Sequence, residues 1–261
     1  MHFKNRTIPF FLTLGFMLVS ISGTAQNRDS LENLLNDKKL SPVTYLNICD
    51  ELSWSYLNDD FGKAKRFALQ GIERARSENI PTMEATLYRN LGVAYYMNSQ
   101  MDSAQLWLDR SLEKAMVSQD EKLEAAVYGA IGNLHNVTGA YQEALSYYLK
   151  ALSMFESQGN NERIRSLLGN IGTLYHSLLN LNQAEKYYLE LEKESKLAGD
   201  TYNLGRAYDG LSRIALREKD FDKSLGYSIS AAEIFHNSNQ QLEEAIALQG
   251  IAMVYYSHYR D

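Results

Sequence analysis

The sequence predicts an all-α fold, an α-solenoid of antiparallel helix pairs that repeat at a fixed period. The first observation is a series of large apolar residues spaced 40 positions apart: Phe61, Met101, Tyr141, Leu181 and Phe221. The second is that a small residue, alanine or serine, lies three positions after each of them. A fixed period of this length indicates one helix-pair unit stacked on its copies, because a single unit cannot bury its apolar face alone.

The first helix of each pair is marked by a large branched residue followed by a small one. These positions are Leu52-Ser53, Leu91-Gly92, Ile131-Gly132, Ile171-Gly172, Leu211-Ser212 and Ile251-Ala252. An aromatic ring usually follows four residues after the large residue, one helical turn away on the same face. The small residue is expected to let a neighbouring helix approach closely. The first spacing is 39, which predicts a turn one residue shorter in the first unit.

The second helix of each pair begins near the 40-spaced apolar residue. It carries apolar or small residues in steps of four and three, as at Ala144, Tyr148 and Ala151, which is typical of an amphipathic helix. Residues that favour turns and helix caps separate the helices, for example Thr138-Gly139 and Gly199-Asp200. Helix pairs joined by short turns therefore account for the whole repeat.

These positions resemble the tetratricopeptide repeat (TPR) family. The resemblance is strongest for Gly132 with Ala144, Tyr148 and Ala151, and it extends to the equivalent residues of the neighbouring units. It implies a right-handed α-solenoid whose first helices line a concave face that binds other proteins. The period is longer than the roughly 34 residues that are usual in the family, so we expect longer helices.

The N-terminus has the features of a secretory signal peptide. Lys4 and Arg6 precede an apolar run over residues 8–21, and the small residues Gly23 and Ala25 follow it. The run is shorter than the roughly 20 residues that span a bilayer. We expect residues 1–25 to be a signal peptide cleaved after Ala25, which makes the mature chain periplasmic or secreted. An uncleaved membrane anchor is the alternative.

Three parts follow from this organisation: the signal peptide over 1–25, an N-terminal capping helix within 26–43, and a solenoid over 44–261. The solenoid is expected to hold five repeats and a final unpaired helix. That last helix is either a terminal cap or a sign that the sequence is the front part of a longer protein.

Composition excludes several classes of function. The net charge of −6 argues against a nucleic-acid partner, which rewards clustered lysine and arginine. Cys49, the one cysteine, has no partner for a disulfide, and no histidine pair has the spacing of a zinc-binding helix. We therefore expect no catalytic residue, no metal and no small-molecule cofactor. A membrane contact is expected only if the chain continues or the signal stays uncleaved.

The candidate site is a stripe on the first helices, at positions beside the packing face. It consists of Asp50, Trp54, Arg89, Val93, Tyr96, Asn133, Asn136, Thr173, His176, Arg206, Asp209, Arg213, Met253 and Tyr256. Aromatic and apolar surface suits peptide side chains, asparagine suits backbone amides, and arginine suits carboxylates. The alternative is that this stripe is ordinary solvated surface.

The sequence thus predicts a secreted or periplasmic scaffold that binds a peptide or protein through its concave face. The alternative is the extracytoplasmic sensor region of a longer bacterial signal-transduction protein, such as a histidine kinase or a transcription regulator. A hydrolase is the third hypothesis, and it would need convergent polar groups in a pocket.

Overall fold

The computed structural model describes residues 27–37 and 39–258, and the predicted signal peptide lies outside these residues. The described residues form helices and turns without a strand, so the all-α prediction is confirmed for them. The chain divides into two compact units, Met1–Lys114 and Ala115–Asp261, and each has buried apolar clusters of its own.

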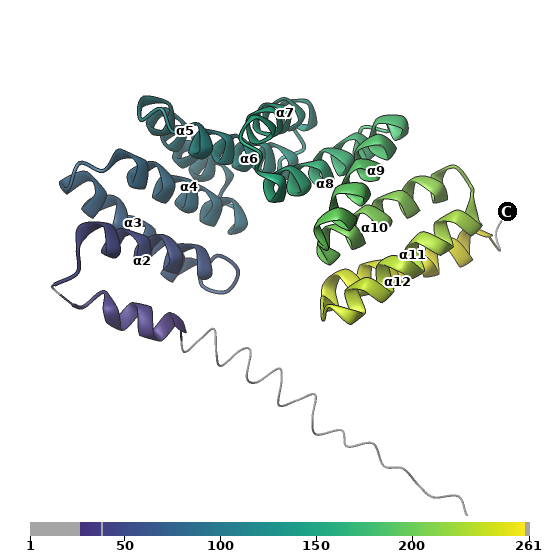
Figure 1. The fold of residues 1–261 in the computed structure, drawn as a ribbon, viewed down its shortest axis with the longest axis horizontal. Coiled ribbons are helices and arrows are strands. Elements are labelled where there is room, and N and C mark those ends of the chain that lie inside the picture. Colours follow the sequence, from purple (N-terminus) through teal and green to yellow (C-terminus); the bar gives the residue numbers. More distant parts are fainter. Residues whose placement is uncertain (1–26, 38, 259–261) are drawn as a thin grey trace, which may run out of the picture. The chain divides into compact units, whose positions relative to one another are not determined.

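Unit 1 contains a leading helix over residues 27–34, followed by longer helices that Figure 1 labels. These are α2 (Pro42–Ser55), α3 (Phe61–Ser77), α4 (Pro81–Met97) and α5 (Met101–Val117). The boundary between the units falls inside α5. α2 begins at Pro42, inside the range predicted for the capping segment, because the Ser41 hydroxyl accepts the Thr44 N–H and proline fits the first turn of a helix.

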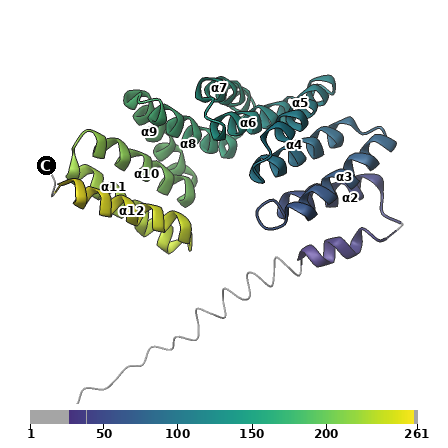
Figure 2. The ribbon, with the colours of Figure 1, turned by 180° about the vertical axis from the view of Figure 1, so that it is seen from behind.

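Unit 2 contains the remaining helices, which Figure 2 shows from behind. They are α6 (Glu121–Val137), α7 (Tyr141–Ser157), α8 (Asn161–Ser177), α9 (Leu181–Ala198), α10 (Thr201–Arg217), α11 (Phe221–Asn237) and α12 (Gln241–His258). Most helices of the chain are equal in length, as α6, α7 and α8 are, and turns of three residues join them, which produces the constant period. α9 is one residue longer and is followed by a turn of two, so the register is kept.

The same turn follows each helix from α3 to α11. Its middle residue has a left-handed backbone, with φ between +54° and +80°, at Asn79, Ser99, Gln119, Gly139, Gly159, Leu179, Gly199, Lys219 and Asn239. The next N–H then donates to the carbonyl five residues earlier, as from Asp220 to Ala215 at 2.9 Å. Asp220 also caps α11 by accepting the Lys223 N–H. One short turn thus ends one helix and starts the next.

The turn between α2 and α3 lacks this left-handed residue. The Asp60 N–H donates instead to the Tyr56 carbonyl at 3.0 Å, and the Asp60 side chain caps α3 at Lys63. The predicted shorter turn is not observed: the segment 56–60 has five residues, where the turn after α4 has three. The first spacing is 39 because α2 ends three residues after Leu52, whereas α4 ends six residues after Leu91.

The glycines of the first helices α4, α6 and α8 make room for a side chain of the second helix, as the sequence predicts. A methyl group added at Gly132 would lie 2.5 Å from the Tyr148 ring. Tyr188 lies between two glycines, because a methyl group at Gly172 would approach its ring to 2.9 Å and one at Gly210 to 2.3 Å. Gly210 belongs to the next repeat, so this ring joins successive helix pairs.

The leading helix is attached to unit 1 by apolar and charged contacts together. Leu31 and Leu35 pack against a buried cluster that includes Leu52 and Phe67. Two turns of helix are too short to be stable alone in water, so this segment depends on its docking.

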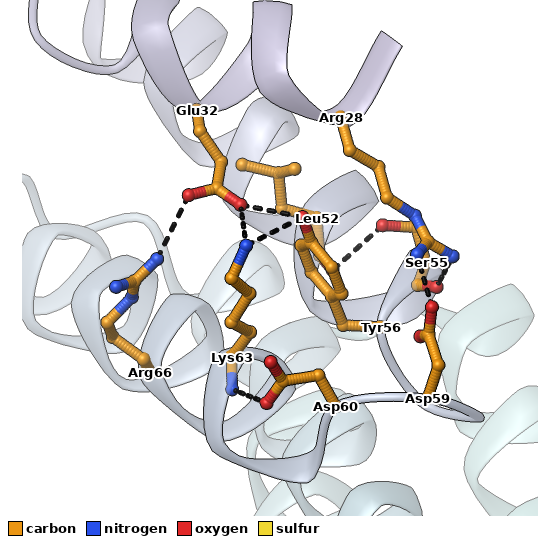
Figure 3. Close-up of polar contacts among 9 residues, drawn as sticks. All are labelled: Arg28, Glu32, Leu52, Ser55, Tyr56, Asp59, Asp60, Lys63 and Arg66. Atoms are coloured by element: carbon orange, nitrogen blue, oxygen red, sulfur yellow. Dashed lines mark hydrogen bonds and ion pairs between the residues drawn. The ribbon is translucent and has the colours of Figure 1, made fainter. Parts of the chain in front are cut away.

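Figure 3 shows the charged part of this docking. The Glu32 carboxylate accepts hydrogen bonds from Tyr56 Oη at 2.6 Å, Lys63 Nζ at 2.8 Å and Arg66 Nη2 at 3.2 Å. These donors hold the pKa of Glu32 below its ordinary value although burial raises it. One turn earlier, Arg28 pairs with Asp59 at 2.5 Å. The leading helix is thus attached to the end of α2 and the start of α3.

Gly210→Ala is expected to destabilise unit 2 by about 2 kcal/mol, because the added methyl group would lie 2.3 Å from the Tyr188 ring, which also packs on Gly172. Urea unfolding followed by circular dichroism measures the effect. Gly226→Ala is the matched control: Gly226 lies inside α11 with no atom within 4 Å of the added methyl group, so alanine should stabilise by about 0.5–1 kcal/mol. Equal effects of the two substitutions would contradict the packing role of Gly210.

Candidate functional site

The candidate site of unit 2 lies on its first helices. α8 contacts α10 and α10 contacts α12, so residues 40 positions apart along the chain become neighbours in space. Two adjoining hollows lie among these three helices, and Asp209 and Ile246 line both of them.

The larger hollow, called here the main hollow, has a volume of about 480 Å³. Its walls combine charged, polar and apolar side chains from all three helices. The lining residues are His176, Asp209, Ser212, Arg213, Leu216, Arg217, Ile246, Gln249, Gly250 and Met253. The predicted residues His176, Asp209, Arg213 and Met253 are therefore brought together.

The main hollow lies where a serine replaces a tyrosine of the repeat. Tyr188 fills the space between its two glycines, whereas the residue 40 positions later is Ser228. Ser212 and Gly250, which correspond to those two glycines, line the hollow. The Ser228 hydroxyl bonds Ser212 Oγ at 2.6 Å and supplies no ring. Ser228 itself is buried, and the main hollow adjoins the two residues that flank it.

His176 holds an arginine in the main hollow. Arg217 Nε donates to His176 Nε2 at 3.2 Å, so the ring nitrogen acts as a neutral acceptor. Burial lowers the pKa of His176 to about 4, and the nearby charges of Arg213 and Arg217 act in the same direction. His176 is 6% exposed. It positions Arg217 and carries no charge near neutral pH.

Asp209 is the carboxylate of the main hollow. Burial raises its pKa, although Arg213 and Arg206 oppose that shift. Its Oδ2 lies 3.9 Å from Arg213 Nη1, which is an ion pair too long for a hydrogen bond. Asp209 therefore compensates the arginines only in part.

The smaller hollow, called here the side hollow, has a volume of about 230 Å³. It is lined by Gly169, Thr173, Tyr188, Tyr202, Arg206, Asp209, Phe235, Glu243 and Ile246. The Arg206 guanidinium lies against Gly169, where an added methyl group would be 2.9 Å from its Cζ. Arg206 Nη2 donates to Asn170 Oδ1 at 2.9 Å and Nη1 to Asn203 Oδ1 at 3.2 Å. Two neutral oxygens thus fix this cation.

The Oδ1 atom of Asn133, which is predicted to contact peptide amides, is engaged within the protein. This atom accepts from Tyr148 Oη at 2.7 Å and from Asn170 Nδ2 at 3.3 Å. Thr173 is similar, since its hydroxyl accepts from Tyr188 Oη and donates to the Gly169 carbonyl. Each tyrosine ring packs on a glycine of the first helix, so its hydroxyl reaches the residue that follows this glycine. Both residues therefore bond the hydroxyl of a core tyrosine.

The predicted residues of unit 1 lie on α2 and α4. Asp50 accepts from the buried Asn90 at 2.6 Å, which joins α2 to α4. Val93 is only 6% exposed, so little of its side chain lies on the surface of α4. Trp54 is 47% exposed, and the Arg89 guanidinium lies 5.5 Å from its ring centre. Tyr96 is partly buried, which raises its pKa.

Three further predicted residues differ in exposure. Met253 and Tyr256 are 51% and 64% exposed on α12, and Asn136 is partly buried at the end of α6.

Sequence reasoning missed Ile246 and Glu243 as lining residues. The repeat register contained the signal, because Ile246 comes 40 positions after Arg206 and Glu243 comes 40 after Asn203.

Neither a metal cluster nor a membrane-spanning helix is found over the described ranges, 27–37 and 39–258. Within them, no group of three or more histidine, cysteine or acidic side chains could hold a metal ion. No helix in this part of the chain is both long and apolar enough to cross a membrane.

Comparisons with known proteins identify the repeat. Residues 123–193 match the sequence model of the family described as tetratricopeptide repeat. No curated protein sequence matches the chain. Solved structures do match it, but their sequence identities are so low that they establish a shared fold only.

BtubC (BKLC) from P. vanneervenii is 19% identical, with a TM-score of 0.68 over 84% of this chain and 91% of that one. The apo form of RapI is 15% identical, with a TM-score of 0.63 over 96% and 97% of the two chains. The Rap conjugation gene regulator of plasmid pLS20, solved in complex with the Phr* peptide, is 11% identical, with a TM-score of 0.65 over 94% and 72%. Residues 123–193 are therefore tetratricopeptide repeats, and the described residues have the fold of TPR-like helical solenoids.

Proposed function

We propose that this chain is a non-catalytic scaffold that binds a peptide or an extended protein segment in the two hollows of unit 2. The observation that carries the proposal is the main hollow itself, which forms where Ser228 replaces the tyrosine of the repeat. A concave site with apolar walls and a few fixed polar groups is the usual form of a binding site.

The lining suits a peptide in three respects. Leu216, Ile246 and Met253 offer apolar contact for side chains, and the Gln249 amide can bond a peptide backbone. The arginines can bond carboxylates. Because Arg206 and Arg217 are already held by internal hydrogen bonds, binding would require little reorganisation.

The structural neighbours support a binding role. The pLS20 Rap regulator was solved with a peptide, and another Rap protein was solved with the competence and sporulation factor. Both are similar to this chain over more than nine tenths of its length. Peptide recognition is therefore compatible with this fold.

The bonding of Ser212 and His176 supports the absence of catalysis. A serine nucleophile needs an adjacent base, but the Ser212 hydroxyl bonds Ser224 and Ser228. The Nε2 atom of His176, which could serve as a base, already accepts the Arg217 N–H. The Ser212 hydroxyl and the His176 Nε2 atom are therefore both engaged in hydrogen bonds within the protein, and not with each other.

We also propose that the mature protein acts outside the cytoplasm, on the basis of the charged and apolar pattern over residues 1–25. Mass spectrometry of the protein purified from an envelope or medium fraction should give Gln26 as the first residue. An intact Met1 in the purified protein would refute cleavage.

Filling the main hollow is expected to abolish binding without unfolding the protein. Ser212→Gly combined with Ser228→Tyr restores the glycine and tyrosine of the preceding repeat, so the new ring should occupy the space. The partner captured by residues 26–261 should bind this variant at least about tenfold more weakly, measured by calorimetry. Its urea unfolding midpoint should not fall.

The matched control for this experiment is Leu149→Asp combined with Leu189→Asp, which changes exposed apolar residues on the second helices α7 and α9. That variant should keep the wild-type affinity. A filled variant that binds as tightly as the wild type would remove the main hollow from the proposal.

The neutral state of His176 makes stability depend on pH. Its folded pKa of about 4 lies below the unfolded value of about 6.5, so the unfolded chain binds the proton more readily. The contribution is therefore fully present above about pH 6.5 and is lost as the pH falls toward 4. The charged groups near the ring are Arg213 and Arg217, and Asp209 lines the same hollow.

His176→Gln keeps an acceptor for Arg217 but does not titrate. The wild type should lose up to about 3 kcal/mol of unfolding free energy between pH 6.5 and pH 4 relative to this variant. Urea titrations at several pH values measure the difference. Parallel pH profiles of the two proteins would show that folding does not lower the pKa of His176.

A further inference from the structure

The two hollows hold more positive charge than their own carboxylates balance. Arg206, Arg213 and Arg217 all come from α10 and line these hollows, in a chain whose net charge is −6. The carboxylates that line the same hollows are Asp209 and Glu243, so one positive charge is in excess. This local sign is opposite to that of the whole chain.

Neutral groups hold two of these arginines. Arg206 is bonded to the amide oxygens of Asn170 and Asn203, and Arg217 to the neutral ring of His176. Among residues 27–37 and 39–258, no carboxylate lies within ion-pair distance of either guanidinium. A guanidinium has five N–H donors, so most donors of both groups stay open to a ligand.

Gly169 is part of this arrangement. Any side chain at position 169 would occupy the space where the Arg206 guanidinium lies flat on α8. Because residue 169 is glycine, the Arg206 guanidinium can lie close to the backbone of α8. Asn170 of the same helix orients this guanidinium by a hydrogen bond. A cation that is fixed before binding loses little conformational entropy when it meets an anion.

We propose that the ligand is anchored by carboxylates, and that it is an acidic peptide segment with an apolar residue between its acidic residues. This inference rests on the proposed function and names the chemistry of its ligand. Arg206 binds one carboxylate in the side hollow, and Arg213 with Arg217 binds another in the main hollow. The apolar residue contacts Ile246, which lines both hollows.

The spacing of the arginines sets the spacing of the acidic residues. Arg206 and Arg213 are seven residues apart on α10, which is about 10 Å along the helix. In an extended polyproline-type segment, residues three apart lie on one side and about 9 Å from each other. The expected ligand pattern is therefore two acidic residues three positions apart.

The test is an array of random nine-residue peptides probed with labelled residues 26–261 at low ionic strength. Bound peptides should be enriched in aspartate or glutamate pairs three positions apart, and about 0.5 M salt should weaken their binding about tenfold or more. Arg213→Gln combined with Arg217→Gln should remove this enrichment. Arg163→Gln combined with Lys193→Gln removes two exposed charges elsewhere on unit 2 and should leave it unchanged.

Gly169→Ala tests the site without a change of charge. The added methyl group should displace the Arg206 guanidinium and weaken binding of an enriched acidic peptide about tenfold, while the far-ultraviolet circular dichroism spectrum stays that of the wild type. Wild-type affinity in this variant would overturn the role given to Arg206.

The outcomes separate the ligand chemistry from the proposed function. Enrichment of neutral or basic peptides, lost in the Ser212→Gly and Ser228→Tyr variant, would overturn the acidic ligand and leave the peptide-binding function in place. An array on which the wild type binds no peptide above this filled variant would overturn both.

Discussion

The rest of this structure depends on the close contact between the paired helices at a single small residue. At Gly132 and Gly172 a tyrosine of the second helix lies directly on the first helix, whereas at Gly92 the leucine Leu108 takes this place. The ring buries a large apolar area in one contact. Tyr188 extends this contact to the next pair through Gly210, so the same side chain closes one repeat and attaches the following one.

This packing also shapes the surface. A tyrosine that crosses over glycine brings its hydroxyl to the first-helix side, where Asn133 and Thr173 accept it. Polar residues on that side are therefore partly used to satisfy core tyrosines, as buried polar groups must be. Where Ser228 replaces the tyrosine, no hydroxyl arrives and no ring fills the space, and the main hollow lies there. The proposed binding site therefore lies at the repeat that departs from the pattern.

Whether the charge of each arginine in the hollows is balanced depends on the group that holds its guanidinium. An arginine that is bonded to a carboxylate has its charge compensated, whereas Arg206 and Arg217 are oriented by amides and by a neutral imidazole. An anion-binding site requires cations that are held in position but not neutralised by a carboxylate of the protein. The leading helix of unit 1 shows the opposite case, because Glu32 with Lys63 and Arg66 forms compensated pairs that serve docking.

The helix pairs, the turn positions and the packing role of the small residues could be predicted from the residues alone. These features recur at a constant spacing and depend on local periodicity, capping and steric size, which one sequence displays directly. The sequence also identified the stripe that contains His176, Asp209, Arg213 and Met253. Only the tertiary structure decided that Val93 is covered, that Asn133 is engaged with Tyr148, and that Ile246 joins the two hollows. The physical reason is that these properties depend on neighbouring helices: Arg217 of α10 meets His176 of α8, and helical spacing alone does not give the rotation of one helix against the next.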